Sequence, residues 1–93
     1  MQHVLIIHEV EDYPAWKLFF DQAAVIRKRA GEISYQLLRY DNDANNIVHF
    51  SQWSSLDSAK RFFESAELIA IRKKAGVKAP NFIYLQEIER GML

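Results

Sequence analysis

The sequence predicts an α+β domain with the ferredoxin-like βαββαβ arrangement, and three observations support this prediction. Stretches with the helical spacing of apolar residues alternate with short stretches of strand character. Their order is strand, helix, strand, strand, helix, strand. The chain has 93 residues, which is enough for one core but not for two. We therefore expect residues 1–93 to form one domain, with a four-stranded antiparallel sheet that has helices on one face.

The first expected strand leads directly into the first expected helix. Residues 2–10 are β-branched and apolar in the middle and predict a strand that is buried on both faces. Asp12 suits an N-cap, and Pro14 suits the first turn of a helix. Apolar residues recur at steps of three and four over residues 14–30, and Gly31 is a natural stop. One continuous helix is expected there.

A hairpin is expected after this helix. Residues 33–40 alternate between two sets of side chains, which is the period of a strand. Residues 41–46 read DNDANN, and these side chains favour turns because they bond their own backbone. Residues 47–53 then form the next strand, so the two strands are antiparallel neighbours.

The last part of the chain is expected to hold a second helix, a short third helix and the final strand. Ser54 or Ser55 caps the second helix, and Ser65 begins the short one, which ends near Gly76. The final strand covers residues 82–88. Because the crossovers are right-handed, the first and third strands should lie side by side at the centre of the sheet.

Both faces of this sheet carry large apolar side chains, although the helices can cover only one. On the first strand, Val4 and Ile6 alternate with Leu5 and Ile7. A contiguous uncovered apolar patch normally marks an interface. We expect the same face of a second copy to cover it, which makes the protein a homodimer.

The composition of the chain excludes several classes of partner and reaction. Twelve basic and twelve acidic side chains cancel, so we expect no nucleic-acid partner and no membrane partner. The chain has no Cys, which excludes disulfides, thiolate zinc sites and a cysteine nucleophile. No glycine-rich phosphate motif occurs. The first ten residues do not resemble a signal peptide, and a cytoplasmic location is expected.

Nearly the whole chain carries a resemblance to a known group of proteins. It lies in HEVEDYPAWKLFFDQ at residues 8–22, RYDNDANNIVHFSQWSS at residues 39–55 and AKRFFESAELIAIRKKAGV at residues 59–77. These segments resemble the dimeric α/β-barrel superfamily, in particular small proteins grouped with antibiotic biosynthesis monooxygenases. The resemblance implies that two sheets close into a barrel, with a small-molecule cleft between the helices and the sheet of each subunit. It implies a fold better than an activity, because members include monooxygenases, haem-degrading enzymes and ligand-sensing modules.

The haem-degrading branch of this superfamily does not match. Its members combine an Asn on the first strand with a Trp and a His, and those two positions hold Phe62 and Arg72 here. The first strand has no Asn. Because the imidazole that would bind iron is missing, we expect no haem, and we predict no other cofactor.

His8 and His49 are the candidate catalytic residues. They lie on strands that should be neighbours, so His8, or His3 on the same strand, could share a cleft with His49. An imidazole can take a proton from a phenol or quinol before that molecule reacts with oxygen. The alternative is that these histidines are interior or interface residues bonded to backbone. No paired-ligand spacing occurs, so no metal site is expected.

Four aromatic side chains are the candidate ligand-binding residues, because they could line a flat apolar cleft for a small aromatic ligand. They are Tyr35, Trp53, Phe62 and Tyr84. Core packing is the competing explanation, since their spacing fits helix and strand faces.

Two basic clusters, at residues 27–29 and 72–74, fall in the last turns of helices, where cations oppose the negative end of the helix dipole. We expect both clusters at the same edge of the domain, where the six positive groups could hold an anion, although the helix dipole alone explains them.

These observations suggest a cofactor-independent monooxygenase-like protein that acts on a small aromatic or quinone-type molecule. The alternative is a non-enzymatic homodimer, a small-molecule-binding or stress-related module that uses the same cleft without turnover.

Overall fold

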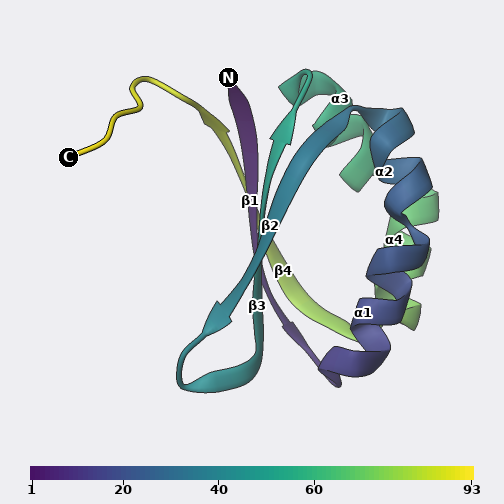
Figure 1. Cartoon of the computed structure of the whole chain (residues 1–93). Coiled ribbons are helices and arrows are strands. Elements are labelled where there is room, and N and C mark those ends of the chain that lie inside the picture. Colours follow the sequence, from purple (N-terminus) through teal and green to yellow (C-terminus); the bar gives the residue numbers. More distant parts are fainter.

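The computed structural model describes residues 1–93 as four strands and four helices. The strands are β1 (Gln2–Val10), β2 (Glu32–Tyr40), β3 (Asp43–Trp53) and β4 (Val77–Gln86). The helices are α1 (Tyr13–Gln22), α2 (Ala24–Ala30), α3 (Leu56–Phe63) and α4 (Ala66–Lys74). All four helices lie on one side of the sheet, as Figure 1 shows. None of the helices has the length and apolar character needed to cross a membrane.

The sheet has the order β2-β3-β1-β4, and every neighbouring pair is antiparallel. This is the predicted ferredoxin-like α+β arrangement, with the first and third strands at the centre. The predicted helix caps are also present. Asp12 accepts from the backbone N–H of Ala15, while Ser55 and Ser65 cap α3 and α4.

The prediction of one continuous helix over residues 14–30 is wrong. The helix breaks at Ala23, which closes α1 and opens α2. Neither Gly nor Pro marks this break in the sequence. It is accompanied by a side-chain contact instead, because the guanidinium of Arg27 donates to the backbone oxygen of Phe20, just before the break.

The bounds of β3 and β4 also differ from the prediction. β3 begins at Asp43 rather than at residue 47, so the hairpin turn is only residues 41 and 42. β4 begins at Val77 and ends at Gln86, which leaves Ile88 outside the strand and fully exposed. Pro80 lies within β4, and it is tolerated there because β4 is an edge strand and its register shifts at this point.

The two basic clusters do not lie at the same edge of the domain. α2 ends at Gly31, whose carbonyl accepts from Ser54, while α4 ends beside Gly76, whose carbonyl accepts from Glu11. These contacts are at opposite ends of β1, because helices that return from the two ends of an antiparallel sheet run in opposite directions.

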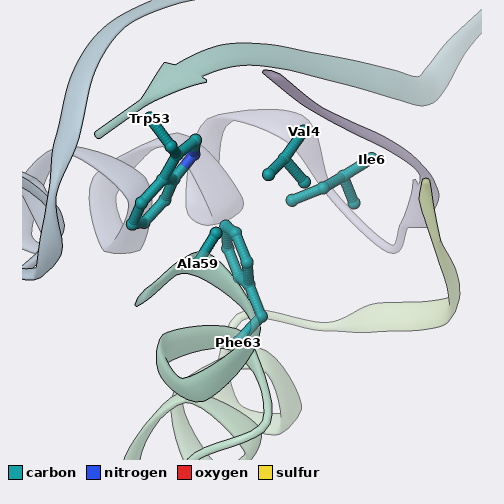
Figure 2. Close-up of a cluster of buried hydrophobic side chains, with 5 residues drawn as sticks. All are labelled: Val4, Ile6, Trp53, Ala59 and Phe63. Atoms are coloured by element: carbon teal, nitrogen blue, oxygen red, sulfur yellow. The ribbon is translucent and has the colours of Figure 1, made fainter. Parts of the chain in front are cut away.

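The core consists of two buried clusters between the sheet and the helices. One joins α3 to the sheet and contains Val4, Ile6, Trp53, Ala59 and Phe63. Figure 2 shows Ala59 and Phe63 facing Val4, Ile6 and Trp53. The other joins α1 to the far end of the sheet and contains Val10, Trp16, Phe20, Ile47 and Ala75. Burial of each large side chain contributes about 1.5 to 3 kcal/mol.

The opposite sheet face has no helix over it (Figure 1). Side chains that alternate with the buried ones point to this face, and many of them are apolar. They include Leu5, Ile7, Val48, Phe50 and Ile83, all half-buried, and Leu38 and Leu85, which are exposed. We call these seven residues the open face. Its apolar character agrees with the sequence prediction.

Candidate functional site

A cavity of about 70 Å³ lies between the sheet and the helices, where the two core clusters meet. Most of its lining is apolar, and the aromatic members are Trp16, Phe19, Phe20, Phe62, Phe63 and Phe82. Four basic side chains also reach it: His8, Arg27, His49 and Arg72. No carboxylate is among the lining residues. The cavity is therefore an apolar space with a few polar groups, which is the usual character of a small-molecule site.

Three buried polar side chains form a connected chain that ends at this cavity. Arg27 donates from Nε to Glu32 Oε1 at 2.5 Å, and Glu32 Oε2 lies 2.7 Å from Nε2 of His49. Each of the three residues is less than one tenth exposed. Arg27 also lies over the Phe20 ring, 3.6 Å from its centroid. Hydrogen bonds to charged groups are strong at such depth, and every member restrains the next.

The carboxyl of Glu32 is held in its ionised form by these partners. Burial alone would raise the pKa of Glu32. The hydrogen bond from His49, together with the charges of His49 and Arg27, outweighs burial and brings the pKa below its ordinary value. A carboxylate is therefore present at neutral pH, and it can only accept hydrogen bonds.

Gly31 determines where Glu32 enters the sheet. Gly31 has φ +121°, which a residue with a side chain rarely adopts, and a Cβ there would lie 2.5 Å from Ser54 Oγ. The chain can therefore turn sharply from α2 into β2. Glu32 pairs with Trp53 at the start of the strand, and a bulge follows before Ser34. His49 lies on the same sheet face, four residues from Trp53 along β3.

His8 lies on β1 beside the same cavity and is 5% exposed. Its Nδ1 atom is buried and makes no hydrogen bond. Its ring centroid is 5.2 Å from that of Trp16. Burial is the main reason that the pKa of His8 falls from 6.5 to about 4, and the nearby charges of His49 and Arg72 lower it further. His8 is therefore neutral at neutral pH.

The edge strand is irregular next to His8. The pairing of β1 with β4 shifts register between Ile7 and Glu9, and β4 has Ala79 with φ +40° followed by Pro80 at this point. Pro80 lines the cavity. Because Pro offers no N–H, this stretch of β4 cannot continue the regular ladder beside His8.

Arg72 is the fourth basic group of the cavity. It is half-buried on α4, and its Nη1 donates to the backbone oxygen of Phe63 at 2.8 Å. Its guanidinium lies 5.0 Å from the centroid of the Phe82 ring. Burial lowers the pKa of Arg72, since no carboxylate compensates for the lost water.

The structure brings together some of the residues that the sequence singled out, but not all of them. His8, His49 and Phe62 line the cavity. Tyr35 is 52% exposed and contacts Phe20 and His49 edge-on, so it lies beside the cavity rather than in its lining.

The other sequence candidates lie elsewhere. Trp53 is 2% exposed in the core, and its indole N–H donates to Ser51. Tyr84 is half-buried on β4 beneath Lys60, outside the cavity lining. His3 lies on the opposite sheet face, where its ring stacks on Phe50. His3 therefore does not share a cleft with His49.

Sequence reasoning missed Arg27, Glu32 and Arg72 as site residues. The two arginines were interpreted as part of helix-capping clusters, but both turn inward while their neighbours Lys28, Arg29, Lys73 and Lys74 stay exposed. A usable signal existed for Arg27, because it falls on the apolar side of the helix, four residues after Ala23 and seven after Phe20.

Comparison with solved structures supports the fold. SnoaB, a cofactor-independent oxygenase from Streptomyces nogalater, is similar with a TM-score of 0.78 and 14% sequence identity, over 96% of this chain and 94% of that one. A protein from Caulobacter crescentus CB15 described as an antibiotic biosynthesis monooxygenase gives 0.73 and 21%, over 95% and 90%. One from Deinococcus radiodurans with the same description gives 0.71 and 12%, over 100% and 98%.

At these identities the structural comparisons establish the fold alone. No curated protein sequence matches the chain. The sequence model of a family does match, and it covers residues 9–74, from the end of β1 to the end of α4. This chain therefore belongs to the antibiotic biosynthesis monooxygenase family.

Proposed function

We propose that this protein is a cofactor-independent monooxygenase-like enzyme that acts on a small aromatic or quinone-type molecule. Its family membership supports this proposal, as does the fold that it shares with SnoaB, a cofactor-independent oxygenase. The observation that carries the proposal is the buried chain from Arg27 through Glu32 to His49, which ends at an apolar cavity. It provides a positioned base beside a largely apolar space.

His49 is the general base in this proposal. In the neutral form that acts as a base, His49 would keep its proton on Nε2 because the Glu32 carboxylate can only accept, which leaves Nδ1 to take the substrate proton. A carboxylate orients a histidine in the same way in serine hydrolases. Glu32 also stabilises the imidazolium that forms. Loss of the hydroxyl proton makes a phenol or quinol electron-rich, and this favours its reaction with oxygen.

The other candidates have supporting roles in this proposal. His8 is neutral and serves the ligand as a hydrogen-bonding group rather than as the principal base. Phe62 contacts the ligand within the cavity, while Tyr35 flanks His49 at its edge. Trp53 and Tyr84 act indirectly, through the packing that shapes the cavity walls. The apolar lining strengthens electrostatic interactions within the site because it keeps water out.

The functional unit that we propose is a homodimer formed through the open face. That face is apolar over both central strands and no helix of the same chain covers it. The residues that line the cavity point to the other side of the sheet, so dimerisation would leave the cavity accessible.

Oxygen consumption with a panel of quinols tests the proposal. We expect turnover by the wild type and a loss of about 100-fold or more in His49→Ala, which is the usual contribution of a general base. His3→Ala is the matched control, because this histidine lies on the opposite sheet face. Equal turnover by wild type, His8→Ala and His49→Ala would show that neither histidine is the base.

One observation favours the alternative, a homodimeric binding or stress-related module without turnover. The enclosed volume of about 70 Å³ is small. A cavity of about 150 Å³ is known to hold benzene, so less than one ring is enclosed here. Quinol binding without oxygen consumption would support the module rather than the enzyme.

A further inference from the structure

The cavity contains two arginines in different states. Arg27 is neutralised by Glu32 and held in place by the backbone of Phe20. Arg72 has no carboxylate within ion-pair distance, and its one hydrogen bond goes to a neutral backbone oxygen. Its guanidinium lies over the apolar ring of Phe82, and the residue is half-buried. A guanidinium that has lost part of its hydration and has no anionic partner gains from pairing with a bound anion.

A second unsatisfied group lies on the same cavity. The Nδ1 atom of His8 is buried without a hydrogen-bond partner. Buried polar atoms nearly always have one, so each exception requires an explanation. Arg72 lines the same cavity as His8. A single ligand group could therefore satisfy both residues.

The chemistry of these two residues restricts what that group can be. An imidazole accepts from a hydroxyl through Nδ1 in one tautomer and donates to an oxyanion through Nδ1 in the other. A guanidinium can only donate, and it stabilises the oxyanion more than the neutral hydroxyl. An acidic hydroxyl, which alternates between these two forms, suits the pair. A carboxylate can pair with Arg72, but it stays ionised at neutral pH and so lacks the hydroxyl form from which His8 could accept.

The small volume determines how such a ligand would enter. Because less than one ring is enclosed, the oxygen and the adjoining part of a ring fit inside, while the rest of the molecule lies towards the surface. Phe19, Phe62 and Ile71 are half-buried members of the lining, and they provide apolar contact for that outer part.

We infer that Arg72 and His8 form an oxygen-binding subsite for the ionisable hydroxyl of a phenol or enol. This inference deepens the proposed function and rests on it for the location of the ligand. His8 contacts the hydroxyl, and Arg72 stabilises the oxyanion that remains after the proton has left. The base, His49, lies on the adjacent strand beside the same cavity.

Binding of para-nitrophenol tests this inference without any need for turnover, because its phenolate absorbs visible light. We expect the wild type to bind the phenolate and to lower the pH at which the bound probe ionises. Para-nitroanisole, its methyl ether, cannot ionise or donate a hydrogen bond. We expect it to bind at least about tenfold more weakly, the usual effect of losing a hydrogen bond to a charged group.

Variants show which residue causes the preference for the phenol over its ether. Arg72→Met should abolish the preference for the phenol over its ether, and Arg72→Lys should retain part of it. Lys73→Met is the matched control, because it removes one charge from the neighbouring, exposed position of the same helix. It should change affinity by less than about twofold. Circular dichroism and thermal unfolding establish that each variant is folded. The variant His8→Phe is a second, independent test of the preference for the phenol over its ether.

The outcomes are distinct. Equal binding of the phenol and its ether, no binding of the phenol, unchanged preference in Arg72→Met, or equally tight binding of para-nitrobenzoate would each overturn the inference. If quinols are oxidised while any of these results holds, the subsite assignment fails and the proposed function stands. If the phenol is bound as expected but no quinol consumes oxygen, the proposed function fails and the subsite stands.

Discussion

His8 links the site to the stability of the fold. In the unfolded chain its pKa is near 6.5, and in the fold it is about 4. Between these values the unfolded chain binds more protons, so lower pH favours unfolding. The contribution of neutral His8 is complete above pH 6.5 and is lost as the pH falls towards 4. At about 1.4 kcal/mol per pH unit, the loss is about 3 kcal/mol.

Urea unfolding of wild type and His8→Phe, at pH values from about 7 to about 4, checks this prediction. We expect the fall in unfolding free energy between pH 6.5 and 4 to be clearly smaller in the variant. Glu32, whose pKa is below its ordinary value, loses its contribution only at lower pH, so the two effects separate. Parallel curves for the two proteins would contradict the assignment to His8.

The pair Arg27 and Glu32 is expected to stabilise the protein only while both members are present. Glu32→Leu leaves a buried guanidinium without its carboxylate and should cost about 3 to 5 kcal/mol of unfolding free energy. The double variant Arg27→Met with Glu32→Leu removes both charges and should recover a large part of that loss. Denaturant unfolding of the four proteins in the cycle measures the coupling. Additive losses would show that the two residues act independently.

The two histidines and Glu32 show why the site was only partly predictable. The chemistry of His8 and His49 can be identified from residue type, and strand order brings them to neighbouring strands. The role of Glu32 depends on a bulge and on one positive φ at Gly31, which place its carboxyl within reach of His49. Neither local event has a signature that names its partner. From the sequence alone, a charged residue in a strand is therefore expected on the surface until the register of the strands is known.

At the level of elements, the turn from α2 into β2 is the most constrained local structure. Gly31→Ala combines a positive φ with a Cβ placed 2.5 Å from Ser54 Oγ. We expect a loss of about 1 to 3 kcal/mol of unfolding free energy, measured by urea or thermal unfolding. Adding Ser54→Ala removes the contact but not the backbone strain, so it should restore only part of the loss. No loss in the single variant would mean that the turn adjusts freely.

The elements themselves were largely predictable because their signals are local. Ser55, Ser65 and Asp12 cap helices through their own side chains, and alternation of side chains identifies the strands. The errors lie where side-chain contacts or strand pairing decide. The break at Ala23 comes with the contact from Arg27 to Phe20. β4 begins before Pro80 because its pairing with β1 resumes there, on the other side of a register shift.

At the level of the whole molecule, two apolar surfaces lie on the side of the sheet away from the helices. One is the open face. The other is the C-terminal segment after β4, which leaves the domain on that side in Figure 1 and carries Ile88, Met92 and Leu93 with their side chains fully exposed. A second subunit on the open face would shelter the first surface, and it would bring its own sheet close to the second.

We therefore expect the protein to sediment as a dimer of about twice 10.9 kDa at micromolar concentration. A stable dimer buries roughly 1,200 to 2,000 Å² in total, which requires most of a sheet face. Ile7→Lys places a charge on the central strand of the open face and should convert the protein to a monomer, because an unpaired buried charge is costly. Leu18→Lys is the matched control, since Leu18 is 64% exposed on α1, on the helical side. A wild type that remains a monomer, or an Ile7→Lys variant that sediments as the wild type does, would show that the open face is not the interface.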